Sequence, residues 1–283
     1  MQELFTGHPA IWLSCATLLG LLVGSFLNVV IHRLPIMLER DWQAQCADLR
    51  GEPVRDADAF NLVVPRSTCP HCGHGIAWYE NIPLVSYLFL RAKCAHCRAG
   101  ISLRYPVVEG LTGLMTLLTA WQFGFGWQSL AAFLLVWALL AMAFIDLDTH
   151  LLPDNITLPL LWLGLIVNLN DFFTTIDSAV LGAVGGYLVL WTVYQLFRLL
   201  TGKEGMGYGD FKLLAALGAW FGWAMLPLII VVSSLVGAVF GVAMILVAGQ
   251  DKSKPIPFGP YLAMAGLIAL FWGDLLMNIY LGK

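Results

Sequence analysis

The stretch AIWLSCATLLGLLVGSFLNVVI occupies residues 10–31 and contains no charged side chain. Its 22 residues are long enough, as a helix, to cross the roughly 30 Å hydrocarbon core of a bilayer. The preceding segment, residues 1–9, holds no Lys or Arg, whereas a secretory signal peptide begins with positive charge. We therefore interpret residues 10–31 as a first transmembrane helix that is retained.

The composition of the whole chain agrees with this interpretation. Of 283 residues, 59% are hydrophobic and only 12% are charged, against about 25% charged residues in a typical soluble domain. The mean hydropathy is +0.78. The net charge of −3 provides no field that would attract a polyanion. These values exclude a water-soluble globular enzyme, a disordered chain and a nucleic-acid-binding protein, and they favour an all-α polytopic membrane protein with the lipid bilayer as its surroundings.

Further apolar runs predict the remaining membrane helices. They cover residues 107–124, 128–145, 156–170, 178–197, 213–249 and 256–273. The run 213–249 is too long for one span, and Gly222 with Pro227 predicts a break into two helices. The sequence therefore predicts about eight transmembrane helices.

The basic residues predict the orientation of these helices. The polar segment 32–105 holds nine of the fifteen Lys and Arg residues, and such residues concentrate in cytoplasmic loops. This places both termini outside the cytoplasm. The predicted organisation is a first helix over residues 1–31, a cytoplasmic loop domain over 32–105 and a seven-helix membrane domain over 106–283.

Two Cys-x-x-Cys pairs lie in the polar segment, separated by 21 residues: Cys69 with Cys72, and Cys94 with Cys97. Four thiolates on two short knuckles suit tetrahedral zinc, and the reducing cytoplasm keeps them available. Since four thiolates leave no open coordination position, the expected zinc is structural, in a small zinc-ribbon-like domain. Four free thiols or a redox pair are the alternatives, and His71 or His96 could replace a cysteine as ligand.

Four aspartates lie near predicted cytoplasmic helix ends: Asp146, Asp148, Asp154 and Asp210. Two carboxylates that meet in a low-dielectric site share a proton, so that one activates water while the other donates to a carbonyl oxygen, as in aspartic proteases. Helix capping could explain Asp154 and Asp210, but Asp146 and Asp148 follow a helix, where the dipole disfavours anions. An ion-coupled transporter could use the same residues.

The motif Gly207-Tyr208-Gly209-Asp210 resembles the Gly-x-Gly-Asp signature of the type IV prepilin leader peptidase family. Phe144-Ile145-Asp146, with the downstream Leu152-Pro153-Asp154, resembles the region of that family's first catalytic aspartate. Four further stretches are similar to family motifs: GSFLNVVIHRLP at 24–35, WYENIP at 78–83, ISLRYP at 101–106 and PFGP at 257–260. The resemblance covers most of the chain.

The resemblance implies a bifunctional enzyme of the bacterial inner membrane with its active site facing the cytoplasm. Such enzymes cleave the leader of type IV prepilins and type II secretion pseudopilins after a glycine, and then methylate the new N-terminal residue with S-adenosylmethionine. It implies Asp146 and Asp210 as the catalytic pair, and it places Gly207, Gly209, Pro257, Gly259 and Pro260 in active-site motifs. Asp154 is present in the family without being catalytic.

Several points stay open at the level of sequence. No Rossmann-type glycine fingerprint marks a site for the methyl donor, and Ala92 stands where many family members have glycine. Glu109 could contact the substrate amine or the cofactor, or its carboxylate could extend to the membrane interface or pair with Arg104. We interpret Lys212 as a positively charged residue that anchors its helix at the cytoplasmic membrane surface. A zinc-stabilised membrane transporter or assembly scaffold without catalysis is the alternative function.

Overall fold

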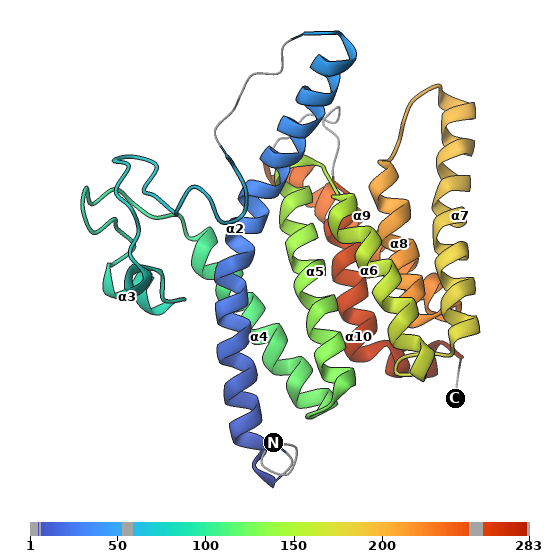
Figure 1. Cartoon of the computed structure of the whole chain (residues 1–283). Coiled ribbons are helices and arrows are strands. Elements are labelled where there is room, and N and C mark those ends of the chain that lie inside the picture. Colours follow the sequence, from blue (N-terminus) through green and yellow to red (C-terminus); the bar gives the residue numbers. More distant parts are fainter. Residues whose placement is uncertain (1–4, 6, 53–58, 249–256, 282–283) are drawn as a thin grey trace. The chain divides into compact units, whose positions relative to one another are not determined.

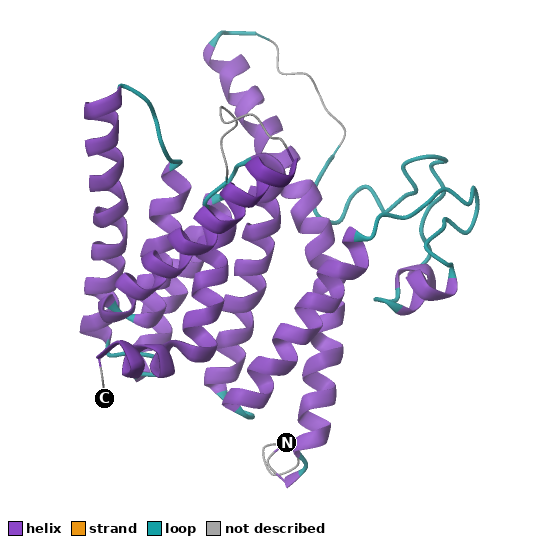
Figure 2. Cartoon of the chain, turned by 180° about the vertical axis from the view of Figure 1, so that it is seen from behind, coloured by secondary structure: helices purple, strands orange, loops and turns teal. Residues whose placement is uncertain are grey.

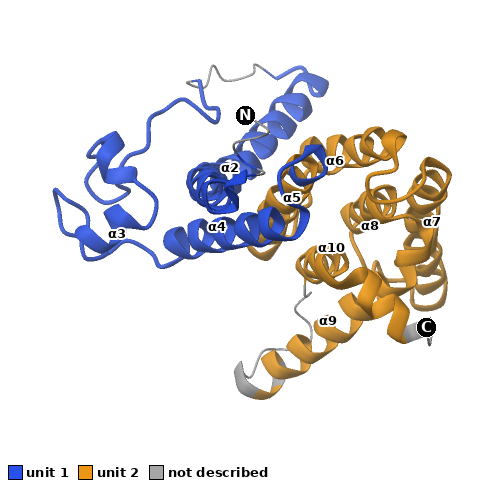
Figure 3. Ribbon diagram, turned by 90° about the horizontal axis from the view of Figure 1, so that it is seen from below, with its two compact units in different colours: residues 1–129 blue, residues 130–283 orange. Residues whose placement is uncertain are grey.

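The computed structural model describes residue 5 and residues 7–52, 59–248 and 257–281. Over these residues the chain is helical, and its only β structure is two isolated bridges (Figure 1). Figure 2 shows one long loop-rich segment, which joins α2 to α4. The chain divides into two compact units, residues 1–129 and 130–283 (Figure 3).

In the first unit, α2 (Pro9–Leu49) packs along α4 (Arg104–Phe123). Their backbones approach closely because glycines line the contact: a Cβ atom on Gly24 would lie 2.8 Å from the Cα atom of Glu109. The indole of Trp12 also donates a hydrogen bond to the Ala120 carbonyl, at 3.2 Å. In lipid, the hydrophobic effect does not drive helices together. Small residues then stabilise a helix pair because they allow close van der Waals packing.

Helix α2 does not end where the apolar run ends. The sequence analysis places the helix end at Ile31, whereas the structure continues the helix to Leu49. Residues 36–49 are mostly good helix formers such as Met, Leu, Glu, Gln and Ala. The guanidinium of Arg33 also donates to the Asn61 carbonyl at 2.9 Å, and that of Arg40 lies 4.3 Å from the Phe60 ring centroid. A helix that leaves the apolar layer is therefore not forced to stop there.

The rest of the first unit is the loop-rich segment with two short helical pieces. These are the 3-10 turn η1 (Trp78–Asn81) and α3 (Val85–Phe89). The carboxylate of Glu80 accepts a hydrogen bond from the backbone N–H of Ala77 at 2.8 Å and so closes the start of η1. This arrangement fixes the direction in which the chain leaves the first cysteine pair.

The second unit surrounds one buried helix. It contains most of α5 (Trp127–Thr149), then α6 (Asp154–Val167), α7 (Ile176–Thr201), α8 (Tyr208–Phe221), α9 (Leu226–Ala248) and α10 (Gly259–Leu281). Helix α8 contacts α6, α7 and α10 and is buried from Leu213 to Trp220. Gly182 of α7 lies directly against Gly218 of α8, so any side chain at either position would meet backbone. This packing sets the position of α8 and of the residues at its start.

The long apolar run breaks as predicted. Gly222, with φ of 80°, ends α8, and a short 3-10 turn (Trp223–Met225) leads into α9. Asn168, fully buried after α6, holds this corner because its amide donates to the carbonyls of Ala219 and Trp220, at 2.8 and 3.0 Å. The break predicted from Gly222 and Pro227 is therefore confirmed.

Among the described residues, eight helices of 14 or more residues overlap the eight predicted runs. In the same part of the chain, five helices are long and apolar enough to cross a membrane: Pro9–Leu49, Trp127–Thr149, Ile176–Thr201, Trp223–Met244 and Gly259–Ile279. α6 and α8 have 14 residues each, or about 21 Å of helix, which is short of the bilayer core. The structure thus supports an all-helical membrane protein with several spanning helices.

Candidate functional site

Asp146 lies in the last turn of α5 and is almost fully buried, with 5% of its surface exposed. Its Oδ2 atom accepts a hydrogen bond from the backbone N–H of Gly259 at 3.0 Å. Gly259 is the first residue of α10, so the carboxylate meets the positive end of a second helix. This contact compensates for the unfavourable position of an acidic residue at the C-terminal end of α5.

Asp210 lies in the first turn of α8 and is also buried, with 7% of its surface exposed. The helix start beside Gly207 and Gly209 favours a carboxylate at this position. A Cβ atom on Gly207 would lie 3.7 Å from Asp210 Oδ2. Both aspartates paired from the sequence are therefore buried residues at helix ends of the same unit.

Leu152 lies next to the glycine motif of each aspartate. A Cβ atom added to Gly209 would lie 2.6 Å from Leu152 Cβ, and one added to Gly259 would lie 3.0 Å from Leu152 Cδ1. The loop between α5 and α6 thus packs under both glycine motifs. Leu152 belongs to the stretch that resembles the region of the family's first catalytic aspartate, but no local signal in the sequence predicts its contact with both glycines.

The other two aspartates have different surroundings. Asp148 is exposed, two residues after Asp146, as the rotation of a helix predicts. Asp154 is exposed as well, and both of its carboxylate oxygens lie 2.7 Å from Lys212 Nζ. Lys212 thus forms an ion pair between α8 and α6. Of the PFGP motif, Gly259 and Pro260 are buried, while Pro257 is partly exposed just before α10.

The four predicted cysteines gather at one point of the first unit. The Sγ atoms of Cys69, Cys72, Cys94 and Cys97 all lie within 4.8 Å of one another. All four are free cysteines, and the Sγ atoms of Cys69 and Cys97 are 3.8 Å apart, which is not a disulfide. The cluster fits a tetrahedral ion such as zinc, because four thiols converge on a single point.

Two similar knuckles build the cluster. In the first, the N–H of Cys69 donates to the His74 carbonyl and the N–H of Gly73 donates back to the Cys69 carbonyl, both at 2.9 Å. The second repeats this pattern around Cys94. Backbone hydrogen bonds from His71 and Cys72 lower the pKa of the Cys69 thiol to about 7, which favours the thiolate that a metal needs.

The predicted alternative ligands do not join the cluster. The ring of His96 stacks on that of His74, with centroids 5.3 Å apart, and the group of metal-ligating atoms found in the described residues consists of the four cysteines. The second pair closes with a bridge between Lys93 and Gly100.

Glu109 lies in α4 and connects this helix to the loop-rich segment. Its side chain is buried, and its Oε2 atom accepts a hydrogen bond from the backbone N–H of Leu84 at 2.9 Å. Leu84 has a positive φ of 59° and immediately precedes α3. The carboxylate therefore fastens the turn after η1 to α4.

Comparison with known proteins gives two family matches that together span most of the chain. Residues 18–123 match the bacterial peptidase A24 N-terminal domain. Residues 132–242 match the type IV leader peptidase family. No solved structure matches the chain.

Curated relatives match over nearly the full length. The chain is 58% identical over 280 residues to a prepilin leader peptidase/N-methyltransferase from Stutzerimonas stutzeri, covering 99% of this chain and 97% of the relative. It is 58% identical to one from Pseudomonas aeruginosa over 99% and 97%. The protein of the same name from Legionella pneumophila is 47% identical over 100% and 99%. These matches favour an enzyme over the transporter or scaffold considered above.

Proposed function

This chain belongs to the type IV leader peptidase family, and from that premise we propose that it is a membrane aspartic endopeptidase that removes the leader of prepilins. It then methylates the new N-terminal residue with S-adenosylmethionine as donor. The proposal extends to pseudopilin precursors of type II secretion, which share the junction of a basic leader with a hydrophobic helix. The observation that carries the peptidase half is the pair of buried aspartates at neighbouring helix ends.

Asp146 and Asp210 are the proposed catalytic residues. Two carboxylates in a buried site share one proton, since both cannot easily be charged. The ionised group takes a proton from water, which attacks the carbonyl carbon of the leader glycine, while the protonated group donates to the carbonyl oxygen. The bond from that carbon to the nitrogen of the next residue then breaks, and the released amine takes up a proton from the pair. The N–H of Gly259 donates a hydrogen bond to Oδ2 of Asp146. The other oxygen, Oδ1, would therefore face the water.

The glycines of the two motifs leave room for the side chains that pack around this pair. A side chain on Gly209 would displace Leu152, and one on Gly259 would strike Asp146 itself. Gly207 precedes α8 in an extended conformation with ψ of 151°, which suits backbone pairing with an extended substrate. We assign Gly207, Gly209, Pro257, Gly259 and Pro260 to the substrate-binding wall of the site.

The proposed topology has eight membrane helices, with both termini outside the cytoplasm and the active site facing the cytoplasm of a bacterial inner membrane. The basic residues support it, because nine of fifteen lie in the segment 32–105. The other three of the eight proposed membrane helices are α4, α6 and α8, which are short or partly polar. A helix such as α8, enclosed by other helices, does not need the length of a lipid-facing span.

We assign zinc to Cys69, Cys72, Cys94 and Cys97. Four thiolates fill all four coordination positions of tetrahedral zinc, so the ion would hold the two knuckles together without taking part in catalysis. Its contribution would be folding free energy for a segment with few buried apolar side chains.

The proposed catalytic pair is tested by Asp146→Asn and Asp210→Asn in the full-length protein, with prepilin cleavage followed on a gel. Each variant removes one member of the acid–base pair, so we expect cleavage to fall by roughly three orders of magnitude. Asp148→Asn is the matched control, because it changes an exposed aspartate two residues away on the same helix. Cleavage at the wild-type rate by either Asp146→Asn or Asp210→Asn would remove the pair from the mechanism.

A further inference from the structure

Helix α3 and the start of α4 leave an apolar surface exposed in the first unit. Leu88 and Phe89 of α3 are 74% and 84% exposed, and Leu103, which directly precedes α4, is 70% exposed. A hollow of about 340 Å³ lies between these two segments, and its lining consists of apolar side chains and one tyrosine: Leu84, Tyr87, Leu88, Leu103, Pro106 and Val107. We call the three exposed side chains together with this hollow the α3 face. Contiguous exposed apolar surface marks a contact with another molecule or with a membrane.

Hydrogen bonds hold the α3 face beside α4. The N–H of Leu84 donates to Glu109 Oε2 in α4 at 2.9 Å. The Tyr87 hydroxyl donates to the Ile101 carbonyl at 3.4 Å, and the N–H of Ile101 donates to the Ala92 carbonyl at 2.7 Å. Both ends of α3 are thus tied to α4 or to the residues that lead into it, so the exposed side chains of α3 keep their place next to this helix.

The contacts of α4 with α2 give the depth of the α3 face along the first spanning helix. The uncharged run of α2 ends at Ile31. The amide of Asn28 donates to the Tyr105 carbonyl at 3.2 Å, so the start of α4 lies level with the last turn of that run. Gly24, about 10 Å further into the run, packs against the backbone of Glu109. Because Glu109 holds the start of α3, this short helix lies at the boundary of the apolar layer and not far beyond it.

The charges around the α3 face fit an anionic membrane surface. Between Glu80 and Glu109 the sequence has no acidic residue and four basic ones: Arg91, Lys93, Arg98 and Arg104. Arg91 follows α3 and Arg104 begins α4, so positive charge borders the apolar side chains on both sides. Each Lys or Arg near an anionic bilayer strengthens the attraction about fivefold. Apolar side chains beside basic ones are typical of a segment that lies in the membrane interface.

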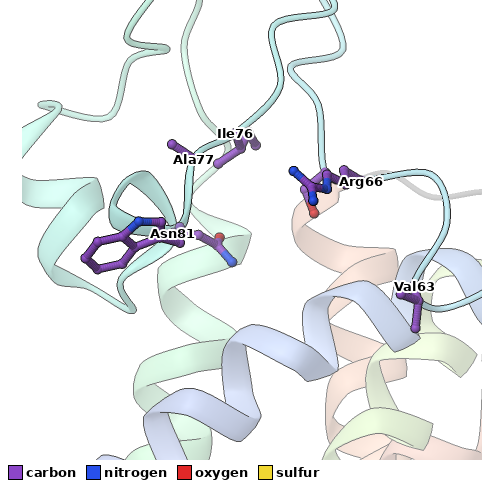
Figure 4. A pocket seen from close by; sticks show the side chains of 7 residues that line it. Val63, Arg66, Ile76, Ala77 and Asn81 are labelled. Carbon is purple, nitrogen blue, oxygen red and sulfur yellow. The ribbon is translucent and has the colours of Figure 1, made fainter.

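A second hollow of the same loop-rich segment has a different lining. It measures about 600 Å³ and lies beside Trp78 of η1. Its walls carry the guanidinium of Arg66 and the amide of Asn81 together with apolar side chains such as Val63 (Figure 4). Acyl chains offer no hydrogen-bonding partner to such polar groups, whereas the hollow at α3 is lined by apolar side chains. The α3 face is therefore the part of this segment that suits lipid.

Since α2 is long and apolar enough to cross a membrane, we propose that the α3 face binds the surface of the same bilayer. Leu88, Phe89 and Leu103 enter the upper part of the acyl chains, and the four basic residues contact the phosphates of anionic lipids. The basic leader of a prepilin is a poorer occupant, because the same charges repel it. Lys93 and Arg98 flank the second cysteine pair, so this contact holds the cysteine knuckle close to the membrane.

Photo-crosslinking of the full-length protein identifies what covers the α3 face. Phe89 is replaced by p-benzoylphenylalanine, which keeps an aromatic side chain, and the protein is irradiated with a prepilin in nanodiscs of equal phosphatidylglycerol and phosphatidylcholine. Mass spectrometry of the digest should find a phospholipid adduct at position 89. The same replacement at Val63, which is 77% exposed but lines the other hollow, is the matched control and should give none. An adduct at position 89 with the prepilin or a second copy in place of lipid, or equal lipid adducts at both positions, would overturn the proposal.

Hydrogen–deuterium exchange tests the contribution of charge. The exchange rate of residues 84–91 is compared between these nanodiscs and nanodiscs of phosphatidylcholine alone, and should be at least about fivefold slower with the anionic lipid. Phe89→Glu, and Arg91→Gln combined with Lys93→Gln, should each remove most of this difference. Arg50→Gln, which changes an exposed basic residue after α2, should keep it. Elution of each variant at the wild-type position in size exclusion shows that it is folded. Equal exchange rates of the wild-type protein in the two lipid mixtures would refute the anionic contact.

Discussion

The backbone nitrogen of Gly259 lies 3.0 Å from the Oδ2 atom of Asp146, although 113 positions separate the two residues in the chain. This bond joins the end of α5 to the start of α10, and it holds a buried carboxylate in place. It also explains why the PFGP motif belongs with the aspartates, because the glycine provides both the N–H and the space for Asp146.

Gly259→Ala should damage cleavage without removing either aspartate. The new Cβ atom would lie 2.6 Å from Asp146 Oδ2 and 3.0 Å from Leu152 Cδ1, so the carboxylate must move. Displacement of a catalytic group by about 1 Å costs on the order of a hundredfold in rate. Steady-state cleavage of a prepilin by purified protein measures the effect. Gly185→Ala is the control, because its Cβ atom would make only an ordinary 3.4 Å contact with Leu226, and equal activity of the two variants would contradict the prediction.

The ion pair between Lys212 and Asp154 should contribute little. Asp154 is 51% exposed in its side chain and Lys212 is 28% exposed, and exposed pairs are worth about 0–1 kcal/mol. We expect Asp154→Asn to retain cleavage within about threefold and to lower the melting temperature by only a few degrees. A loss of activity as deep as that of Asp210→Asn would show instead that Asp154 takes part in the chemistry.

Asn168→Ala should weaken the fold while sparing the chemistry. The side-chain amide donates to the carbonyls of Ala219 and Trp220, and its oxygen accepts from the N–H groups of Phe173 and Thr174 at 3.1 and 3.2 Å. Leaving these buried groups unpaired costs about 3 kcal/mol. Thermal unfolding should occur at a clearly lower temperature, with cleavage retained in the cold. Asn170→Ala, an exposed asparagine two residues later, should melt as wild type does.

Metal analysis of the purified protein should find about one zinc ion per chain, the stoichiometry of a four-thiolate site. Cys69→Ser and Cys94→Ser each remove one ligand from a different knuckle and should bind zinc far more weakly. Chelation should make the loop-rich segment susceptible to proteolysis, because its fold depends on the closed knuckles. Cys46→Ser, which changes an exposed cysteine of α2 outside the cluster, is the control. A folded protein without metal would refute the zinc assignment.

The sequence by itself determined the class of the protein and the types of residue at its sites. Apolar runs predict helices because only a helix satisfies its backbone inside a bilayer, and the break at Gly222 follows from the lack of a Cβ atom there. Two Cys-x-x-Cys pairs predict one cluster because their spacing already places each pair on a single knuckle. Where the helix leaves the apolar layer, at Ile31, this local reasoning was wrong, since water does not end a helix made of good helix formers.

Which distant groups meet depends on the fold. The packing of α5, α6, α8 and α10 brings Gly259 to Asp146, Leu152 to both glycine motifs and Lys212 to Asp154. Such contacts join positions far apart in the chain, and no local pattern records them. The cavity beside Trp78 depends in the same way on a ladder that brings Ser67 to Ile76. The periodicity and spacing of residues in the sequence limit the secondary structure of each segment. Close packing in the fold decides which groups each side chain contacts.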